Sequence, residues 1–141
     1  MTSFVSHTSV DCADAYALSE FWKQVLGYVD VKGDPNEPGH EECMILDPGP
    51  DPAHAHHLLF IEVPEPKTVK NRLHLDLRPR TGTQADELAR LLSIGATQVA
   101  DLRGTFGPGT GWVVLADPEG NEFCLLRSEA ENAARDGRPS D

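Results

Sequence analysis

The stretch KNRLHLDLRP, residues 70–79, is the most informative segment for the fold of this chain. Leu73, Leu75 and Leu77 alternate strictly with polar residues that include His74 and Asp76. Alternation with a period of two is typical of a half-buried strand, because successive side chains leave opposite faces. We therefore expect a strand over residues 72–78 whose leucines face a core. The other face carries an imidazole, a carboxylate and guanidinium groups, so it is a candidate wall of a site.

Composition and charge restrict the class of protein. The chain has 141 residues, enough for one domain or for two small modules that share a core. Its formal net charge of −11 argues against nucleic acid and against an anionic membrane surface as partners. No apolar run approaches the roughly 20 residues of a membrane span, and the first ten residues lack the pattern of a signal peptide. We expect a soluble globular protein.

The three cysteines are scattered and odd in number. Cys12, Cys43 and Cys124 lie far apart and form no CxxC pair. This spacing is typical of reduced thiols rather than of a disulfide framework or a zinc knuckle. The expected compartment is the cytoplasm.

The order strand–helix–strand–strand–strand occurs twice along the chain, which predicts an α+β fold of two βαβββ modules. His7 and His74 are separated by nearly the same number of residues as Gly27 and Gly95, which supports a duplication. The first module, about 4–64, is expected to hold strands 4–10, 28–31, 42–47 and 57–64, and a helix between Asp14 and Gly27. The second, about 71–127, is expected to hold strands 72–78, 97–102, 112–117 and 121–127, and a helix between Thr83 and Gly95. Residues 1–127 then form a single domain, and the polar tail 128–141 is expected to be frayed, with residues 129–135 as a solvated helical turn.

Each module has one helix to cover one face of its strands, which leaves the other face open. In the first strand, Phe4 and Val10 lie on one face and His7 lies on the other. In the last strand, Phe123 and Leu125 are expected to pack under the helix, which leaves Glu122 and Cys124 on the opposite face. If the two sheets curl into one cup, its concave face collects the polar residues, and Trp112 lies near it beside a glycine-rich loop. A concave pocket with a few convergent polar groups is the usual form of a ligand site. The candidate ligand-binding residues are His7, His74, Asp76, Trp112, Glu122 and Cys124.

Three blocks resemble the vicinal-oxygen-chelate superfamily, in particular its glyoxalase-like and bleomycin-resistance-like branch. They are DCADAYALSEFWKQVLGY, FIEVPEPKTVKNRLHLDL and VVLADPEGNEFCLL, and the resemblance covers roughly residues 4–127. It implies paired βαβββ modules that form a cup-shaped mixed sheet. Members of the superfamily include metal-dependent lyases, isomerases and dioxygenases, thiol transferases, and proteins that sequester drugs, so the fold alone does not specify the chemistry.

The resemblance also bears on metal binding. His7 and His74 stand where metal-dependent members carry their histidines, but Cys124 stands where their DPxGNxxE pattern has a glutamate. Glu122 lies two residues earlier on the same face, and the matching position of the first module is Ile61 or Glu62. A thiolate could replace the carboxylate, yet a lone buried cysteine is usually a small apolar filler. We therefore expect no cofactor, with a divalent metal at His7 and His74 as the alternative.

The sequence is compatible with three functions. The first is metal-independent binding of a small molecule, and the second is sequestration of an antibiotic. The third is catalysis as a lyase, isomerase or dioxygenase, in which His74 and Glu122 are the candidate catalytic residues. Asp76 and Glu122 could act as an acid–base pair, or could simply form salt bridges with Arg72 or Arg78. Open sheet edges and the resemblance both favour a homodimer.

The other polar stretches are weaker candidates for sites. HAHH, residues 54–57, lies in a proline-rich loop and is expected to be solvated. GTFGPGTG, residues 104–111, lacks the ending of a phosphate-binding loop and is expected to border the mouth of the cup.

Overall fold

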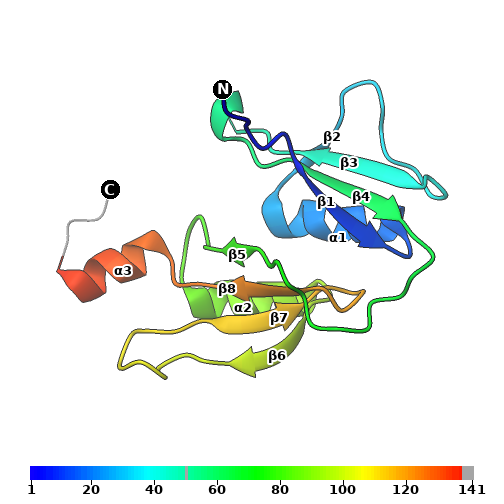
Figure 1. The fold of residues 1–141 in the computed structure, drawn as a ribbon. Helices are drawn as coiled ribbons and strands as arrows, with labels where there is room; N and C mark the ends of the chain where they lie inside the picture. The colour runs from blue at the N-terminus through cyan, green and yellow to red at the C-terminus, as the bar shows by residue number, and fades with distance from the viewer. Residues whose placement is uncertain (50, 138–141) are drawn as a thin grey trace. The chain divides into compact units, whose positions relative to one another are not determined.

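The computed structural model describes residues 1–49 and 51–137. The chain divides into a first unit, Met1–Thr68, and a second unit that begins at Val69. Each unit contains a four-stranded mixed sheet and a helix in the order βαβββ, so the predicted α+β class and the two modules are confirmed (Figure 1). No helix in the described part of the chain is long and apolar enough to cross a membrane.

The sheet of the first unit has the strand order β1-β4-β3-β2. Strand β1 runs parallel to β4, whereas β3 is antiparallel to both β4 and β2. The elements are β1 (Thr8–Cys12), α1 (Ala15–Leu26), β2 (Val29–Asp30), β3 (Glu42–Leu46) and β4 (Leu58–Glu62), with a short 3₁₀ helix at Pro52–His54.

Helix α1 begins and ends where the sequence predicted. The Asp14 side chain accepts a hydrogen bond from the Ala17 N–H at 3.0 Å, which satisfies one of the unpaired donors of the first turn. Gly27 ends the helix with φ of 71°, a left-handed conformation that costs glycine little. The apolar face of α1 packs against the sheet through β3 and β4. The buried residues of the helix are Ala15, Leu18, Ser19, Phe21, Trp22 and Val25.

The second unit repeats this arrangement with the strand order β5-β8-β7-β6. Strand β5 runs parallel to β8, and the other neighbours are antiparallel. The elements are β5 (Asp76–Leu77), α2 (Gln84–Ser93), β6 (Thr97–Asp101), β7 (Val113–Ala116), β8 (Glu122–Leu125) and α3 (Glu129–Asp136).

Helix α2 is fixed to the back of this sheet (Figure 1). Thr83 and Asp86 form the predicted capping box. Buried Gln84 donates from Nε2 to the Leu125 carbonyl at 2.9 Å, which joins the first turn of α2 to β8. Phe123 is buried together with Leu125, as the alternation of the last strand predicted, so the opposite face of β8 is left for polar side chains.

Two predicted strands are shorter than expected. The first strand begins at Thr8 rather than at residue 4, so Phe4, which is 89% exposed, lies outside the strand that was predicted to contain it. Strand β5 holds only two residues, and Leu73 is 86% exposed. Alternation predicts which face a side chain takes, but the length of a strand depends on how many backbone partners the neighbouring strand offers. Here β8 pairs with Asp76 and Leu77 alone in the regular ladder.

The tail contains a capped helix of eight residues where a solvated helical turn within a frayed segment was expected. Ser128 caps α3 through a box with Glu131. A carboxylate oxygen of Glu131 also accepts the Gln84 N–H at 2.9 Å, so α3 and α2 are joined at their first turns. Ala133 is buried. The remainder of the predicted tail, 138–141, lies outside the described residues.

Candidate ligand site

The pairing of β5 with β8 brings three reactive side chains of the second unit to one face. Asp76 and Cys124 are partners in the parallel register. The N–H of Cys124 donates to the Leu75 carbonyl at 2.9 Å, which extends this pairing by one residue toward His74. Side chains two positions apart in an extended chain leave the same face, so His74 lies on the side of Asp76. An imidazole, a carboxylate and a thiol therefore meet.

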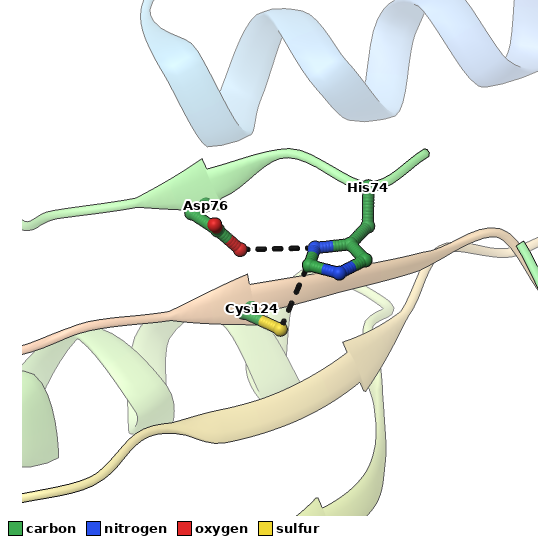
Figure 2. A group of neighbouring side chains, drawn as sticks. All are labelled: His74, Asp76 and Cys124. Atoms are coloured by element: carbon green, nitrogen blue, oxygen red, sulfur yellow. Dashed lines mark hydrogen bonds and ion pairs between the residues drawn. The ribbon is translucent and has the colours of Figure 1, made fainter. Parts of the chain in front are cut away.

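The three side chains form a compact group (Figure 2). His74 Nδ1 lies 3.0 Å from Asp76 Oδ1, and Cys124 Sγ lies 3.9 Å from the same nitrogen. One ligand atom from each residue lies within 4.8 Å of the other two, so the group could hold a metal ion. In a nucleophilic triad the carboxylate and the thiol contact opposite ring nitrogens. Here both contact Nδ1, so the group is not arranged as a cysteine–histidine–aspartate triad.

These residues line a cavity of about 440 Å³, which is within the size range of small-molecule sites. Five of the six side chains proposed from the sequence are among those lining it, and the sixth, His7, belongs to the first unit. Lys70, Val114 and Leu126 also line the cavity, although no pattern in the sequence marked them as site residues. The full lining is Lys70, His74, Asp76, Trp112, Val114, Glu122, Cys124 and Leu126.

Lys70 and Glu122 form an ion pair at the cavity. Lys70 Nζ lies 2.7 Å from Glu122 Oε2. The lysine side chain is 71% exposed, whereas that of the glutamate is 17% exposed. Holding an exposed lysine in one conformation costs side-chain entropy. Lys70 can therefore leave the ion pair for solvent more easily than Glu122 can. Apart from His74, the ionisable lining of the cavity consists of Lys70, the two carboxylates and the Cys124 thiol, so the carboxylates outnumber the lysine.

Burial keeps the thiol of Cys124 protonated. Desolvation is the largest cause that raises its pKa to about 11, and the charge of Asp76 and the hydrogen bond to that carboxylate add to it. Lys70 acts in the opposite direction. At neutral pH the cysteine is thus a weak donor rather than a nucleophilic thiolate.

The turn between β7 and β8 supports the positions of Glu122 and Cys124. Buried Asp117 accepts the Asn121 N–H and the Glu119 N–H, each at 2.9 Å, and the Gly120 N–H donates to the Asp117 carbonyl at 2.9 Å. These bonds close the type I turn that the sequence predicted. The turn residues therefore set the register in which β8 returns along β7.

Trp112 forms an aromatic wall of the cavity. Its ring stacks on Phe106 with centroids 5.6 Å apart and planes inclined by 20°. Phe106 belongs to the glycine-rich loop and is 67% exposed. The base of this loop is closed by the Leu102 N–H, which donates to the Trp112 carbonyl at 2.9 Å. The expectation that the loop borders the site is consistent with this arrangement.

In the first module, His7 and Glu62, the candidate metal ligands suggested by the resemblance, contact residues of their own unit. His7 precedes β1, is exposed, and its Nδ1 lies 3.0 Å from the Ser6 hydroxyl. Because His7 and His74 belong to different units, their joint metal site remains a prediction. Glu62 accepts the Ala15 N–H at 3.0 Å, so this carboxylate stabilises the start of α1.

The other sequence candidates have partners away from the cavity. Within the HAHH tract, His54 contacts Asp51 and His57 accepts the Asp47 N–H at 3.1 Å. Arg78 forms an ion pair with Glu129 at 3.3 Å. The expected alternative, in which an arginine of the β5 segment pairs with a site carboxylate, is not observed for this residue.

The comparisons with known proteins agree with this architecture. The chain matches the glyoxalase-like domain family over residues 7–126. No curated protein is significantly similar to it in sequence.

Several solved structures share the fold at low sequence identity. A possible glyoxalase from Bacillus cereus has 14% identity and a TM-score of 0.61 over 89% of this chain and 99% of its own. A mutant of the fosfomycin resistance protein FosX from Listeria monocytogenes, complexed with Mn(II) and 1S,2S-dihydroxypropylphosphonic acid, has 14% identity and a TM-score of 0.64, over 96% and 98%. A glyoxalase/bleomycin resistance/dioxygenase family enzyme from Burkholderia phytofirmans PsJN has 20% identity and a TM-score of 0.60, over 85% and 94%.

Proposed function

The chain belongs to the glyoxalase-like domain family, and on that premise we propose that it is a small-molecule-binding protein whose ligand occupies the cavity of the second unit. The observation that carries this proposal is the convergence of His74, Asp76, Glu122 and Trp112 on one cavity of about 440 Å³. A few directed polar groups beside an aromatic wall are typical of small-molecule sites.

The charges favour a cationic or aromatic ligand. Asp76 and Glu122 supply two carboxylates, and Trp112 supplies a ring face for stacking or for a cation–π contact. A ligand amine competes with Lys70 for Glu122, because the lysine is largely exposed and loses little when it returns to solvent. His74 is held by Asp76 at 3.0 Å and can donate or accept according to its tautomer.

Recognition by this site does not require manganese. A FosX structure contains Mn(II), but manganese prefers oxygen donors. The donor group here includes the Cys124 thiol where the resemblance places a glutamate. These residues do not fit manganese, so we assign the ligand contacts to side chains alone.

An enzymatic function is the second candidate. The hydrogen bond between His74 and Asp76 favours it, because a carboxylate that orients an imidazole suits proton transfer. Glu122 is the second candidate catalytic residue. The reaction would be a lyase or isomerase step by proton transfer, or, if His7 joins His74 around a metal, a metal-dependent lyase, isomerase or dioxygenase reaction.

A thermal-shift screen of metabolites and antibiotics tests the proposal. Each compound that raises the melting temperature is retested on His74→Ala and Glu122→Gln, with His56→Ala and Glu65→Gln as matched controls at exposed positions outside the cavity. Binding should be weakened about tenfold or more by either cavity substitution, since a lost charged hydrogen bond is worth ~1.5–3 kcal/mol, and the controls should bind normally.

Product analysis of each stabilised mixture separates the two candidates. Tight binding without turnover selects the binding protein, and an antibiotic among the ligands selects the sequestering variant. Product formation that both cavity substitutions abolish selects the enzyme. Ligands that bind equally to all four variants would show that the site lies elsewhere.

We also propose a homodimer in the cytoplasm. Each sheet has two edge strands, and exposed edges favour association unless they are covered. Cys12, Cys43 and Cys124 are buried thiols outside any disulfide, as in proteins of a reducing compartment.

A further inference from the structure

We propose that His74, Asp76 and Cys124 form a binding site for a thiophilic metal ion of the zinc type, built entirely within the second unit. This site shares His74 and position 124 with the one that the resemblance implies, but it has a thiol at position 124 and uses Asp76 in place of His7 of the first unit. It also goes beyond the proposed function, because small-molecule recognition in the cavity does not depend on it.

The geometry of the three donors fits a zinc-sized ion. Typical bonds of ~2.3 Å to sulfur and ~2.0–2.1 Å to nitrogen or oxygen give separations between tetrahedral ligand atoms of about 3.3–3.6 Å. His74 Nδ1 lies 3.0 Å from Asp76 Oδ1 and 3.9 Å from Cys124 Sγ. All three atoms lie within 4.8 Å of one another. Small side-chain rotations therefore suffice to close the group around an ion.

The backbone makes this group reproducible rather than accidental. Asp76 and Cys124 face each other in the ladder, and His74 is two residues before Asp76 on the same face. The three side chains also line the cavity, so an ion between them keeps its remaining coordination positions open to the cavity. When the ion binds, the thiol proton passes to solvent and sulfur coordinates as the thiolate.

The type of donor sets the preference among metals. Thiolate and imidazole ligands favour zinc, whereas carboxylate, carbonyl and water suit magnesium, calcium and manganese. In this group the Cys124 thiol stands where the resemblance places a glutamate, so the metal ligands include a sulfur atom in place of a carboxylate oxygen. Glu122 is instead held by Lys70 at 2.7 Å. Zinc and cadmium should therefore bind well and manganese poorly.

Metal titration of the protein, previously dialysed against a chelator, tests this inference. Zn²⁺, Cd²⁺ and Mn²⁺ are added separately and bound metal is measured by elemental analysis, while cadmium–thiolate charge-transfer absorption reports sulfur coordination. We expect one Zn²⁺ or Cd²⁺ per chain. Cys124→Ser should weaken binding at least ~100-fold and abolish the absorption, since loss of even an outer-shell partner costs ~10–100-fold.

Matched variants guard against other sites and against misfolding. Cys12→Ser retains the cluster and should bind normally, as should the double variant His54→Ala/His56→Ala, which removes two histidines of the HAHH tract. His74→Ala and Asp76→Asn remove donors at exposed positions and should each weaken binding, whatever the stability of the Cys124 variant. Cys124→Glu should shift the preference toward Mn²⁺.

Three results would overturn the inference: no zinc or cadmium bound, binding unaffected by Cys124→Ser and His74→Ala, or manganese bound by the wild type as tightly as zinc. The proposed function is tested separately, because its ligand screen can be run with a chelator present. Ligand binding that persists without metal leaves the proposed function intact even if this site fails.

Discussion

Gly111→Ala should destabilise the aromatic wall of the cavity far more than a similar substitution in the same loop. Gly111 adopts φ of 90°, and a Cβ there would lie 2.0 Å from the Leu102 carbonyl oxygen. The Leu102 N–H is held by the Trp112 carbonyl at 2.9 Å, so the chain cannot move away freely. Two penalties act together: the left-handed conformation of a residue with a Cβ, and the close approach of two backbone segments.

The magnitude follows from these two penalties. The left-handed conformation costs about 1–2 kcal/mol for a residue other than glycine. Relief of the close approach requires a backbone shift, and overpacking of this kind costs about 1–3 kcal/mol. We expect Gly111→Ala to lower the free energy of unfolding by about 2–5 kcal/mol. Gly104→Ala is the matched control, because Gly104 has φ of 77° and no atom within 4 Å of the added Cβ.

Urea unfolding of the two variants and the wild type measures the difference. Gly104→Ala should lose only about 1–2 kcal/mol, the conformational cost alone. Gly111→Ala should also change the fluorescence of Trp112, whose carbonyl and ring adjoin the displaced segment. Equal losses of free energy from the two substitutions would refute the argument that this close approach shapes the cavity wall.

Three further predictions concern the support of the site and the assembly. Asp117→Ala should lower the free energy of unfolding by about 2–5 kcal/mol in urea titrations, since two backbone N–H groups lose a charged acceptor; a loss below ~0.5 kcal/mol would contradict this role. Arg103 holds the pKa of the Asp101 carboxyl at about 2, so this pair stabilises the fold above pH 3.8 and progressively less as the pH falls toward 2. NMR titration of Arg103→Gln should find the Asp101 pKa closer to 3.8, and an unchanged pKa would remove the arginine as its cause. Light scattering should give the mass of a homodimer at micromolar concentration, and a monomer mass would reject the predicted pairing.

Local signals in the sequence were sufficient for the helices that carry them. Asp14 and Gly27 cap the two ends of α1 as predicted, because capping depends on residues within one turn of the helix end. The same kind of signal is present at Ser128 and Glu131, but because the segment has no apolar face, residues 129–135 were predicted only as a solvated helical turn. What stabilises α3 is partly a polar contact, the Glu131 carboxylate on the Gln84 N–H. A contact between residues far apart in the chain leaves no periodic pattern.

The candidate site was more predictable than the strand that carries part of it. Alternation placed Asp76 and Cys124 on the face away from the helix, and both line the cavity. It overstated β5, because Leu73 lies beyond the reach of the β8 ladder and stays exposed. Lys70 was missed because it precedes the regular strand and reaches Glu122 through a long, exposed side chain. Such a reach cannot be inferred from periodicity.

The most direct test of the account is an amide chemical-shift map of the ¹⁵N-labelled protein titrated with a small set of aromatic amines. If the cavity of the second unit is the ligand site, the shifts should concentrate in β5, in β8 and around Trp112. In Glu122→Gln the same shifts should need about tenfold or more ligand to reach half saturation. Saturable shifts confined to the first unit, or shifts that persist unchanged in Glu122→Gln, would contradict the central claim.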